Sequence, residues 1–275
     1  MPKINYPLIV SDFDGTLLNS SREISQKTKA TIKRYINAGG RFAVSTGRMP
    51  AAILPHVKAL GLSGVVCCAE GGVIVDIESE EILLESRISN EIAVKICEKM
   101  EALGLHIHVF DLWEYYSNMD DEYLTYYENV VKTKAVIIKN KPISKFVKES
   151  RINPVKIFAM LDPKDNERVR LELERENFEG CNVTSGSTSL VEVGNIHYSK
   201  GTSVEFLAKR YGVDISKTIA VGDQLNDLSM IKRAGLGFAV KNADAELKKH
   251  AICLDLSNDE DAVAYIIDKY GYTEE

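Results

Sequence analysis

The sequence predicts an α/β protein whose core is a Rossmann-like, doubly wound parallel sheet, with an α+β cap domain inserted into it. At both ends of the chain, short apolar strands alternate with helices, which is typical of a parallel sheet covered on both faces. The middle of the chain has longer, more charged segments that are richer in aromatic residues, which indicates a second, open-faced sheet. We therefore expect the core at residues 1–82 and 194–275, and the inserted cap at 83–193.

The first core segment is predicted to alternate strands and helices. Ser25 is a plausible N-cap for one helix, and Gly39-Gly40 is a matching end. Gly71-Gly72 is typical of a hairpin turn between two strands. The expected strands are 8–10, 41–45, 64–69 and 73–75, and the expected helices are 25–38 and 50–60.

The cap is predicted to combine charged helices with strands that have one exposed face. Residues 106–110 alternate polar and apolar side chains, so we expect a half-exposed strand there in preference to a metal site built from His106 and His108. Further strands are expected at 156–161 and as an antiparallel pair within 181–193, with helices at 90–103 and 165–177.

Aromatic residues cluster in one part of the cap. We expect them to pack in its core; the alternative is that one or two face the active site and contact the leaving group. They are Trp113, Tyr115, Tyr116, Tyr123, Tyr126 and Tyr127.

The second core segment returns to the pattern of the first. A helix starting near Ser199 ends at Gly212, and an apolar strand follows. The expected helices are 199–211, 226–234 and 259–270, and the expected strands are 218–221 and 237–240.

Composition narrows the range of partners. The chain has 275 residues and a net charge of −6, from 34 basic and 40 acidic residues, so no concentrated basic face for nucleic acid is expected. The apolar stretches are too short to span a membrane. Five cysteines without zinc-like spacing favour a reduced, cytoplasmic protein, which we expect to be a monomer or a small homo-oligomer.

Polar clusters follow several of the predicted core strands. Asp12 and Asp14 follow the first, Thr46-Gly47-Arg48 follows the second, and residues 222–227 follow the strand at 218–221. Lys200 begins a helix after a strand-like segment. Ligand sites in open parallel sheets form at the carboxyl ends of the strands, so these clusters are expected to converge.

The converging residues would suit phosphoryl transfer. Asp12, Asp14, Asp223 and Asp227 would repel one another without a divalent cation, and an all-oxygen ligand set favours Mg²⁺. The side chains of Lys200, Thr46 and Asn226, together with backbone N–H groups near Gly15 and Gly47, would donate to a phosphate. One carboxylate could act as nucleophile, and a second, two residues further on, could protonate the leaving oxygen and later activate water.

These clusters resemble, in order, the four motifs of the haloacid dehalogenase superfamily. The matching segments are Asp12-Phe13-Asp14-Gly15-Thr16-Leu17, Ser45-Thr46-Gly47-Arg48, Lys200-Gly201 and Gly222-Asp223-Gln224-Leu225-Asn226-Asp227. The position of the insert, between the second and third motifs, is similar to that in the Cof-type branch of sugar-phosphate and related phosphatases.

The resemblance implies a role for each matching residue. Asp12 is implied as nucleophile and Mg²⁺ ligand, and Asp14 as general acid/base whose backbone carbonyl binds the metal. Asp223 is an implied Mg²⁺ ligand, and Asp227 supports the metal or Lys200. The implied phosphate-binding residues are Phe13, Thr46, Gly47, Lys200 and Asn226.

The chain departs from the family pattern at two positions. Glu70-Gly71-Gly72 replaces a common Asn-Gly-Ala, and Lys241-Asn242-Ala243 replaces a common Gly-Asn-Ala. Glu70 could alter what the mouth of the site accepts.

Simpler explanations exist for several of these residues. Asp12 and Asp14 could belong to a helix cap or an Asp-Gly turn, but their place after a buried strand favours a site. Arg48 is expected either to pair with a surface carboxylate or to act near the site. Lys164 to Glu179 is expected to be a solvated helix face.

The expected function is hydrolysis of small phosphorylated metabolites, with sugar phosphates as the expected class, by a Mg²⁺-dependent phosphatase acting through an aspartyl-phosphate. The alternatives are a phosphomutase of the same superfamily and a non-catalytic sugar-phosphate binding protein. A phosphoacceptor signalling module is disfavoured by the insert, and a true dehalogenase by Asp14 and the metal cluster.

Overall fold

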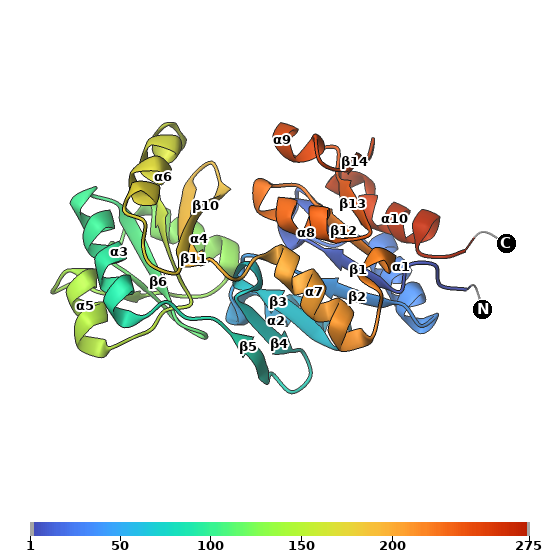
Figure 1. The fold of residues 1–275 in the computed structure, drawn as a ribbon, viewed down its shortest axis with the longest axis horizontal. Coiled ribbons are helices and arrows are strands. Elements are labelled where there is room, and N and C mark those ends of the chain that lie inside the picture. The colour runs from blue at the N-terminus through green and yellow to red at the C-terminus, as the bar shows by residue number, and fades with distance from the viewer. Residues whose placement is uncertain (1–2, 274–275) are drawn as a thin grey trace.

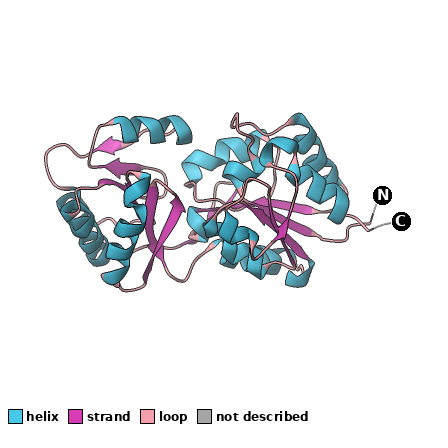
Figure 2. Cartoon of the chain, turned by 90° about the horizontal axis from the view of Figure 1, so that it is seen from above, coloured by secondary structure: helices cyan, strands magenta, loops and turns pink. Residues whose placement is uncertain are grey.

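The computed structural model describes residues 3–273 and has two lobes (Figure 1). The lobe at the right of Figure 1 contains both ends of the described chain, and the lobe at the left contains the middle of the sequence. Seen from above, each lobe has its own sheet with helices packed against it (Figure 2). The chain is therefore an α/β core with an inserted second lobe, which confirms the predicted fold class.

The sheet of the core lobe is parallel throughout. Its strands, in spatial order, are β14 (Ile252–Cys253), β13 (Leu236–Ala239), β12 (Thr218–Gly222), β1 (Leu8–Ser11) and β2 (Arg41–Val44). β1 lies in the middle and pairs with β12 on one side and β2 on the other, so Leu8 is opposite both Thr218 and Arg41. This register brings the ends of three strands level at one edge.

Helices cover both faces of this sheet. Ser25 caps α1 as predicted, since its side chain accepts the N–H of Thr28 at 3.0 Å. The helices of this lobe are α1 (Gln26–Asn37), α2 (Pro50–Ala59), α7 (Lys200–Tyr211), α8 (Leu228–Arg233), α9 (Ala245–Lys248) and α10 (Ala262–Tyr270). The last two predicted helices start later than expected, because 3-10 turns precede α8 and α10.

The third predicted strand does not join the ladder of the parallel sheet. β3 (Val65–Cys68) pairs antiparallel with β4 (Val73–Asp76), which pairs with β5 (Ile82–Glu85). A single parallel bridge, Ser45 with Cys67, connects β3 to the end of β2. The link between β3 and β4 is a 3-10 turn over Ala69–Gly71, in which Glu70 has a left-handed backbone.

The inserted lobe has a six-stranded mixed sheet. Its order is β10 (Cys181–Ser187), β11 (Leu190–Asn195), β9 (Lys156–Met160), β6 (His106–Phe110), β7 (Tyr115–Ser117) and β8 (Val136–Ile137). β10 and β11 form the predicted antiparallel pair. The helices of this lobe are α3 (Asn90–Ala102), α4 (Glu122–Val131), α5 (Ile143–Ser150) and α6 (Asn166–Arg175).

The prediction that residues 106–110 have one exposed face is wrong. β6 lies in the interior of the sheet, between β9 and β7, and all five of its residues are buried. His106 and His108 pair with each other, with 2.8 Å between their Nε2 atoms, and Asp121 contacts His106 Nδ1 at 2.9 Å. The histidines therefore form a buried polar cluster with Asp121.

Four of the six predicted aromatic residues pack in or against the core: Tyr115 and Tyr116 are buried, and Tyr123 and Tyr127 are partly buried. Tyr115 stacks on Phe110, with 5.0 Å between ring centroids, and Tyr127 contacts both rings edge-on. Trp113 and Tyr126 are exposed. Among residues 3–273, no helix is both long and apolar enough to cross a membrane.

Candidate active site

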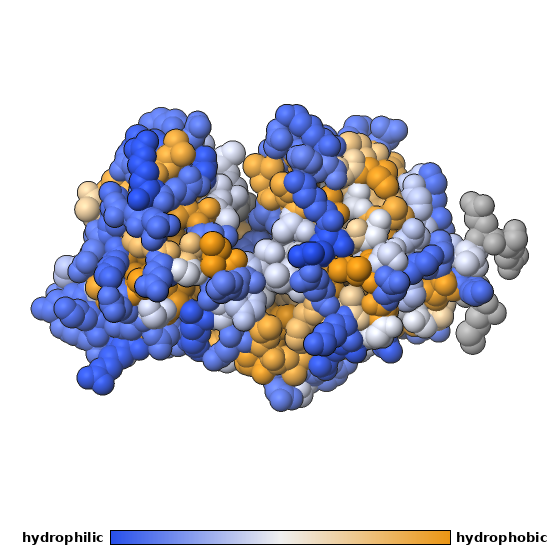
Figure 3. Space-filling view, viewed as in Figure 1, coloured by the Kyte–Doolittle hydropathy of each residue, from blue (hydrophilic) through white to orange (hydrophobic). Residues whose placement is uncertain are grey.

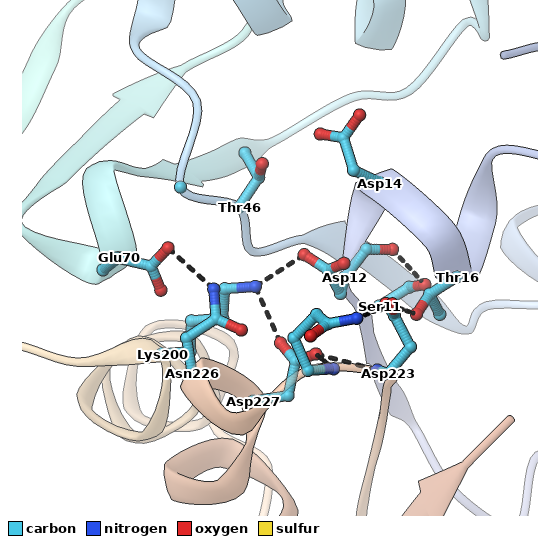
Figure 4. Close-up of polar contacts among 12 residues, drawn as sticks. Ser11, Asp12, Asp14, Thr16, Thr46, Glu70, Lys200, Asp223, Asn226 and Asp227 are labelled. Carbon is cyan, nitrogen blue, oxygen red and sulfur yellow. Dashed lines mark hydrogen bonds and ion pairs between the residues drawn. The ribbon is translucent and has the colours of Figure 1, made fainter. Parts of the chain in front are cut away.

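The predicted polar clusters gather at the carboxyl edge of the parallel sheet (Figure 4). Asp12 directly follows β1, Thr46 lies just beyond β2, and Asp223 directly follows β12. Lys200, the first residue of α7, reaches the same point from a helix whose N-cap, Ser199, accepts the N–H of Thr202. The level register of β1, β2 and β12 brings these residues together.

Lys200 links two of the aspartates. Its Nζ atom lies 2.6 Å from Asp12 Oδ1 and 2.7 Å from Asp227 Oδ1, and all three residues are buried. Burial disfavours a charged ammonium, but Asp12 and Asp227 outweigh this effect and raise the pKa of Lys200 well above its ordinary value. Lys200 is therefore a fixed positive charge beside Asp12.

The loop after β12 positions the other two carboxylates. Asp227 Oδ2 accepts the backbone N–H groups of Asp223 and Gln224, at 2.8 and 2.9 Å. Asp223 accepts the Thr16 hydroxyl at 2.7 Å and the Gln224 side-chain amide at 3.1 Å. The loop therefore holds itself in place through Asp227 and directs Asp223 toward Asp12.

The residues present fit a divalent cation. Asp12, Asp223 and Asp227 each offer a carboxylate oxygen within 4.8 Å of the others, and all three are buried. Burial raises the pKa of Asp12 and of Asp223, and the neighbouring carboxylates add to the rise. Within residues 3–273, one ammonium, that of Lys200, pairs with this group of carboxylates, and it contacts Asp12 and Asp227. A hard cation with oxygen ligands would neutralise the excess negative charge.

Asp14 lies apart from these three carboxylates. Its side chain is half exposed and points away from Asp12 (Figure 4). Arg48 binds it with two parallel hydrogen bonds, Nε to Oδ2 and Nη2 to Oδ1, both 2.7 Å long. Arg48 therefore pairs with a half-exposed carboxylate, and that carboxylate is the Asp14 of the candidate site. The Arg48 guanidinium also stacks over the buried ring of Phe13, 5.0 Å from its centroid.

Thr46 and Asn226 approach from opposite sides (Figure 4). Thr46 is buried, and its hydroxyl oxygen accepts the N–H of Arg48 at 3.1 Å. Asn226 donates its Nδ2 to Glu70 Oε1 at 2.9 Å. Gly47 lies so close to Glu70 that a Cβ would collide with the carboxylate.

The two departures from the family pattern differ in their placement. Glu70 lies at the site and contacts Asn226. Beside Lys241, the side chain of Asn242 donates to the carbonyl oxygen of Gly15 at 2.9 Å, which fastens the loop that carries Asp14. The site therefore contains one residue, Glu70, whose charge differs from that of the Asn in the common pattern.

A pocket of about 360 Å³ extends from Lys200 toward the inserted lobe. Figure 3 shows the molecule hollowed between the two lobes, where β10 and α8 face each other in Figure 1. The core contributes Glu70, Lys200 and Asn226 to the pocket. The polar residues contributed by β9, β10 and β11 are Lys156, Asn182, Thr184, Glu192 and Asn195.

Sequence reasoning missed Lys156 and Glu192. Lys156 Nζ lies 2.7 Å from Glu192 Oε2, and it donates to the carbonyl oxygen of Gly47 at 2.8 Å. Both residues lie on predicted strands among ordinary cap residues, and neither follows a recognisable spacing. No sequence signal distinguishes them, because Gly47 is more than a hundred residues from Lys156, and Glu192 is also distant from Lys156 in the sequence.

This arrangement combines a buried carboxylate, a fixed ammonium and several hydrogen-bond donors beside a pocket. Lys200 holds Asp12 Oδ1, and within residues 3–273 no hydrogen bond reaches Asp12 Oδ2. That oxygen is available to attack an electrophile. The donors around it suit an anionic group, and the pocket beyond Lys200 suits the group attached to that anion.

The chain is similar in sequence to proteins named phosphatases and in structure to a hydrolase, which agrees with a site that binds an anionic group. The phosphatase YwpJ of Bacillus subtilis is 27% identical over 284 residues, which cover 94% of this chain and 98% of YwpJ. The 5-amino-6-(5-phospho-D-ribitylamino)uracil phosphatase YwtE of the same organism is 28% identical, with 95% and 96% of the two chains covered. The crystal structure of a haloacid dehalogenase-like hydrolase from Bacteroides thetaiotaomicron superimposes with a TM-score of 0.82 and 30% identity, over 96% of this chain and 99% of that one.

The family itself follows from the extent of the match. The sequence profile of haloacid dehalogenase-like hydrolases matches residues 9–267, which include both core segments and the inserted lobe. The chain therefore belongs to the haloacid dehalogenase-like hydrolases.

Proposed function

We propose that this enzyme is a phosphatase that hydrolyses small phosphorylated metabolites, most simply sugar phosphates, through an aspartyl-phosphate on Asp12. The observation that carries the proposal is the contact of Lys200 with Asp12 and Asp227, inside a buried group of three carboxylates. The phosphatase names of YwpJ and YwtE support it.

The first step would be attack of Asp12 Oδ2 on phosphorus. A bond forms between this oxygen and phosphorus, and the bond from phosphorus to the substrate oxygen breaks. Asp14 gives its proton to the departing oxygen, which leaves as an alcohol. Lys200, Thr46, Asn226 and the N–H of Gly47 would hold the phosphoryl oxygens.

The second step would be hydrolysis of the aspartyl-phosphate. Asp14, now ionised, takes a proton from water, and the water oxygen bonds to phosphorus. The bond between phosphorus and Asp12 breaks, which releases inorganic phosphate and restores the carboxylate. Arg48 holds Asp14 away from Asp12 in this structure, so Asp14 must rotate toward the pocket for both proton transfers.

Asp12, Asp223 and the backbone carbonyl of Asp14 would hold a Mg²⁺ ion, with Asp227 supporting the site through Lys200. When bound, this ion would neutralise charge on the phosphoryl oxygens.

The test is phosphate release from sugar phosphates, nucleotides, flavin and pyridoxal phosphates, and an aryl phosphate. Each compound is assayed with Mg²⁺, with chelator, and with the Asp12→Asn variant. The matched control is Glu81→Gln, which changes an exposed carboxylate outside the site. Mg²⁺-dependent release that Asp12→Asn abolishes and Glu81→Gln retains would support the proposal. Interconversion of sugar-phosphate isomers with little free phosphate would show a mutase, and binding without turnover would show a binding protein.

A further inference from the structure

Glu70 lies where the phosphate-holding residues meet the pocket (Figure 4). Its Oε1 atom accepts Asn226 Nδ2 at 2.9 Å, and it lies against Gly47, where there is no room for a Cβ. A negatively charged group is therefore built into the wall of a site that is otherwise arranged to bind anions.

The backbone fixes the position of this carboxylate. Glu70 adopts a left-handed conformation, with φ 56° and ψ 27°, which is uncommon for residues other than glycine. Its N–H donates to the carbonyl oxygen of Thr46 at 3.1 Å, and the N–H of Ala69 donates to that of Arg48 at 2.9 Å. The turn is thus fastened to the loop after β2, and the side chain starts from a fixed point.

Of the two carboxylates that line the pocket, Glu192 has an ion pair and Glu70 has none within residues 3–273. Among the lining residues, Lys200 is neutralised by Asp12 and Asp227, and Lys156 is neutralised by Glu192. Lys232 is exposed at the surface, where water and salt screen its charge. Glu70 has no ion pair within residues 3–273, and its one hydrogen-bonding partner there is the neutral amide of Asn226.

The charge of Glu70 acts across the pocket. Burial raises the pKa of Glu192, Lys156 opposes this rise, and the negative charge of Glu70 adds to it. Glu192 lies on β11 of the inserted lobe, so a group bound between Glu70 and Glu192 would experience the field of Glu70. The nearby side chains of Asn182, Thr184 and Asn195 are neutral and polar, which suits hydroxyl groups.

We propose that Glu70 determines specificity by the charge of the leaving group. The fixed carboxylate favours monophosphates whose leaving group carries hydroxyl or ammonium groups, and disfavours those that carry a second phosphate or a carboxylate. This inference rests on the proposed function and narrows its substrate class.

Three sugar phosphates of similar size differ in the charge of the leaving group. Because 6-phosphogluconate is an open chain, the test compares the same ratio of substrates between the wild type and the variants, which removes the difference in shape. Glucosamine 6-phosphate carries an ammonium group, glucose 6-phosphate is neutral apart from its phosphate, and 6-phosphogluconate carries a carboxylate. We would measure kcat/KM for each with the wild-type enzyme, with Glu70→Gln, with Glu70→Asn and with the surface control Glu81→Gln. Gln keeps the acceptor for Asn226 without the charge, and Asn adopts the left-handed conformation readily.

The expected result is a wild-type preference for glucosamine 6-phosphate over 6-phosphogluconate. Both Glu70 variants should reduce the ratio of the two kcat/KM values by about tenfold, since neutralising a nearby charge removes attraction for one and repulsion for the other. Glu81→Gln should leave the ratio unchanged. Added salt should weaken the wild-type preference if Glu70 acts through its charge.

Two outcomes would overturn the inference, and they are distinguishable. Phosphate release with a ratio that both Glu70 variants change by less than about twofold would refute the role of Glu70 and leave the phosphatase standing. No phosphate release by the wild-type enzyme from these compounds, or from an aryl phosphate, would overturn the proposed function and this inference together.

Discussion

The ammonium group of Lys156, on β9 of the inserted lobe, donates a hydrogen bond to the carbonyl oxygen of Gly47 in the core, at 2.8 Å. The same ammonium pairs with Glu192 at 2.7 Å, and the side chains of Lys156 and Glu192 are only 6% and 12% exposed. The rings of Phe110 and Phe158 lie 5.3 and 5.6 Å from it. One buried cation therefore ties the inserted lobe to the loop that carries Thr46.

We expect Lys156→Met to reduce both stability and turnover. Without its partner, Glu192 becomes an unpaired buried carboxylate, which should cost about 3–5 kcal/mol of unfolding free energy. Gly47 loses the bond that fixes its peptide, so kcat should fall by about tenfold or more through misplacement of the phosphate. Urea unfolding and steady-state kinetics measure the two effects separately.

The double variant Lys156→Met with Glu192→Gln is the control for stability. It removes the unpaired charge, so part of the lost stability should return while kcat stays low. A double variant with wild-type kcat would show that Lys156 acts only on stability and does not position Gly47.

Asp14→Asn should lower kcat/KM most for substrates whose leaving oxygen must be protonated as it departs. We expect a loss of about 10²–10⁴ in kcat/KM for glucose 6-phosphate, because its alkoxide leaves poorly without a general acid. The loss for 4-nitrophenyl phosphate should be much smaller, since nitrophenolate leaves without a proton. Equal losses for both substrates would argue that Asp14 does not act as the acid.

Mg²⁺ should stabilise the folded protein through the buried carboxylates. Asp12, Asp223 and Asp227 lie within reach of one ion, and a ligand at a hundred times its Kd adds about 2.7 kcal/mol. We therefore expect the Tm to rise by about 5–10 °C in saturating Mg²⁺, and Asp223→Asn to remove most of this rise. A thermal scan with Mg²⁺ and with chelator measures it. A full rise in the Asp223→Asn variant would place the binding elsewhere.

His108 should make the protein less stable in mild acid. Burial lowers the pKa of His108 well below its ordinary value of 6.5, and His106 and Lys156 lower it further. The unfolded chain then binds the proton more readily than the folded protein. The contribution of His108 to the free energy of unfolding is therefore fully present above about pH 6.5, and it is lost as the pH falls toward the folded-state pKa. Between these two pKa values, protonation linked to His108 changes the free energy of unfolding by up to about 1.4 kcal/mol per pH unit.

His108→Phe removes this slope while it fills the same aromatic surroundings, which include Phe110 and Phe158. The measurement is the unfolding free energy of both proteins at pH 7.5 and pH 5.5, with the exposed His197→Gln as a control. The wild type should lose more stability on acidification than His108→Phe. Equal losses would contradict the predicted effect of burial.

Local sequence patterns predicted most of the core. Ser25 caps α1, Asp12 directly follows β1 and Asp223 directly follows β12, as the apolar runs and polar residues indicated. These features depend on hydrogen bonds and periodicities within a few residues of each other. Because parallel strands end at a common edge, their order along the chain was enough to predict that the polar clusters meet.

The burial of individual strands and the contacts between distant segments could be learned only from the tertiary structure, because they depend on which elements pack against each other. Residues 106–110 alternate as a half-exposed strand would, yet both faces of β6 are covered. Ile107 and Val109 pack in a core with α3 and α5, and His108 and Phe110 on the other face contact Tyr127. The pairing of Arg48 with Asp14, and the contact of Glu70 with Asn226, join segments far apart in sequence. In the sequence, nothing distinguishes Lys156 from other lysines on strands. Only the packing of the two lobes places its Nζ atom 2.8 Å from the carbonyl oxygen of Gly47. Such contacts arise from the packing of whole elements, so the sequence determined the chemistry of the site, and the three-dimensional arrangement decided which side chains control access to it.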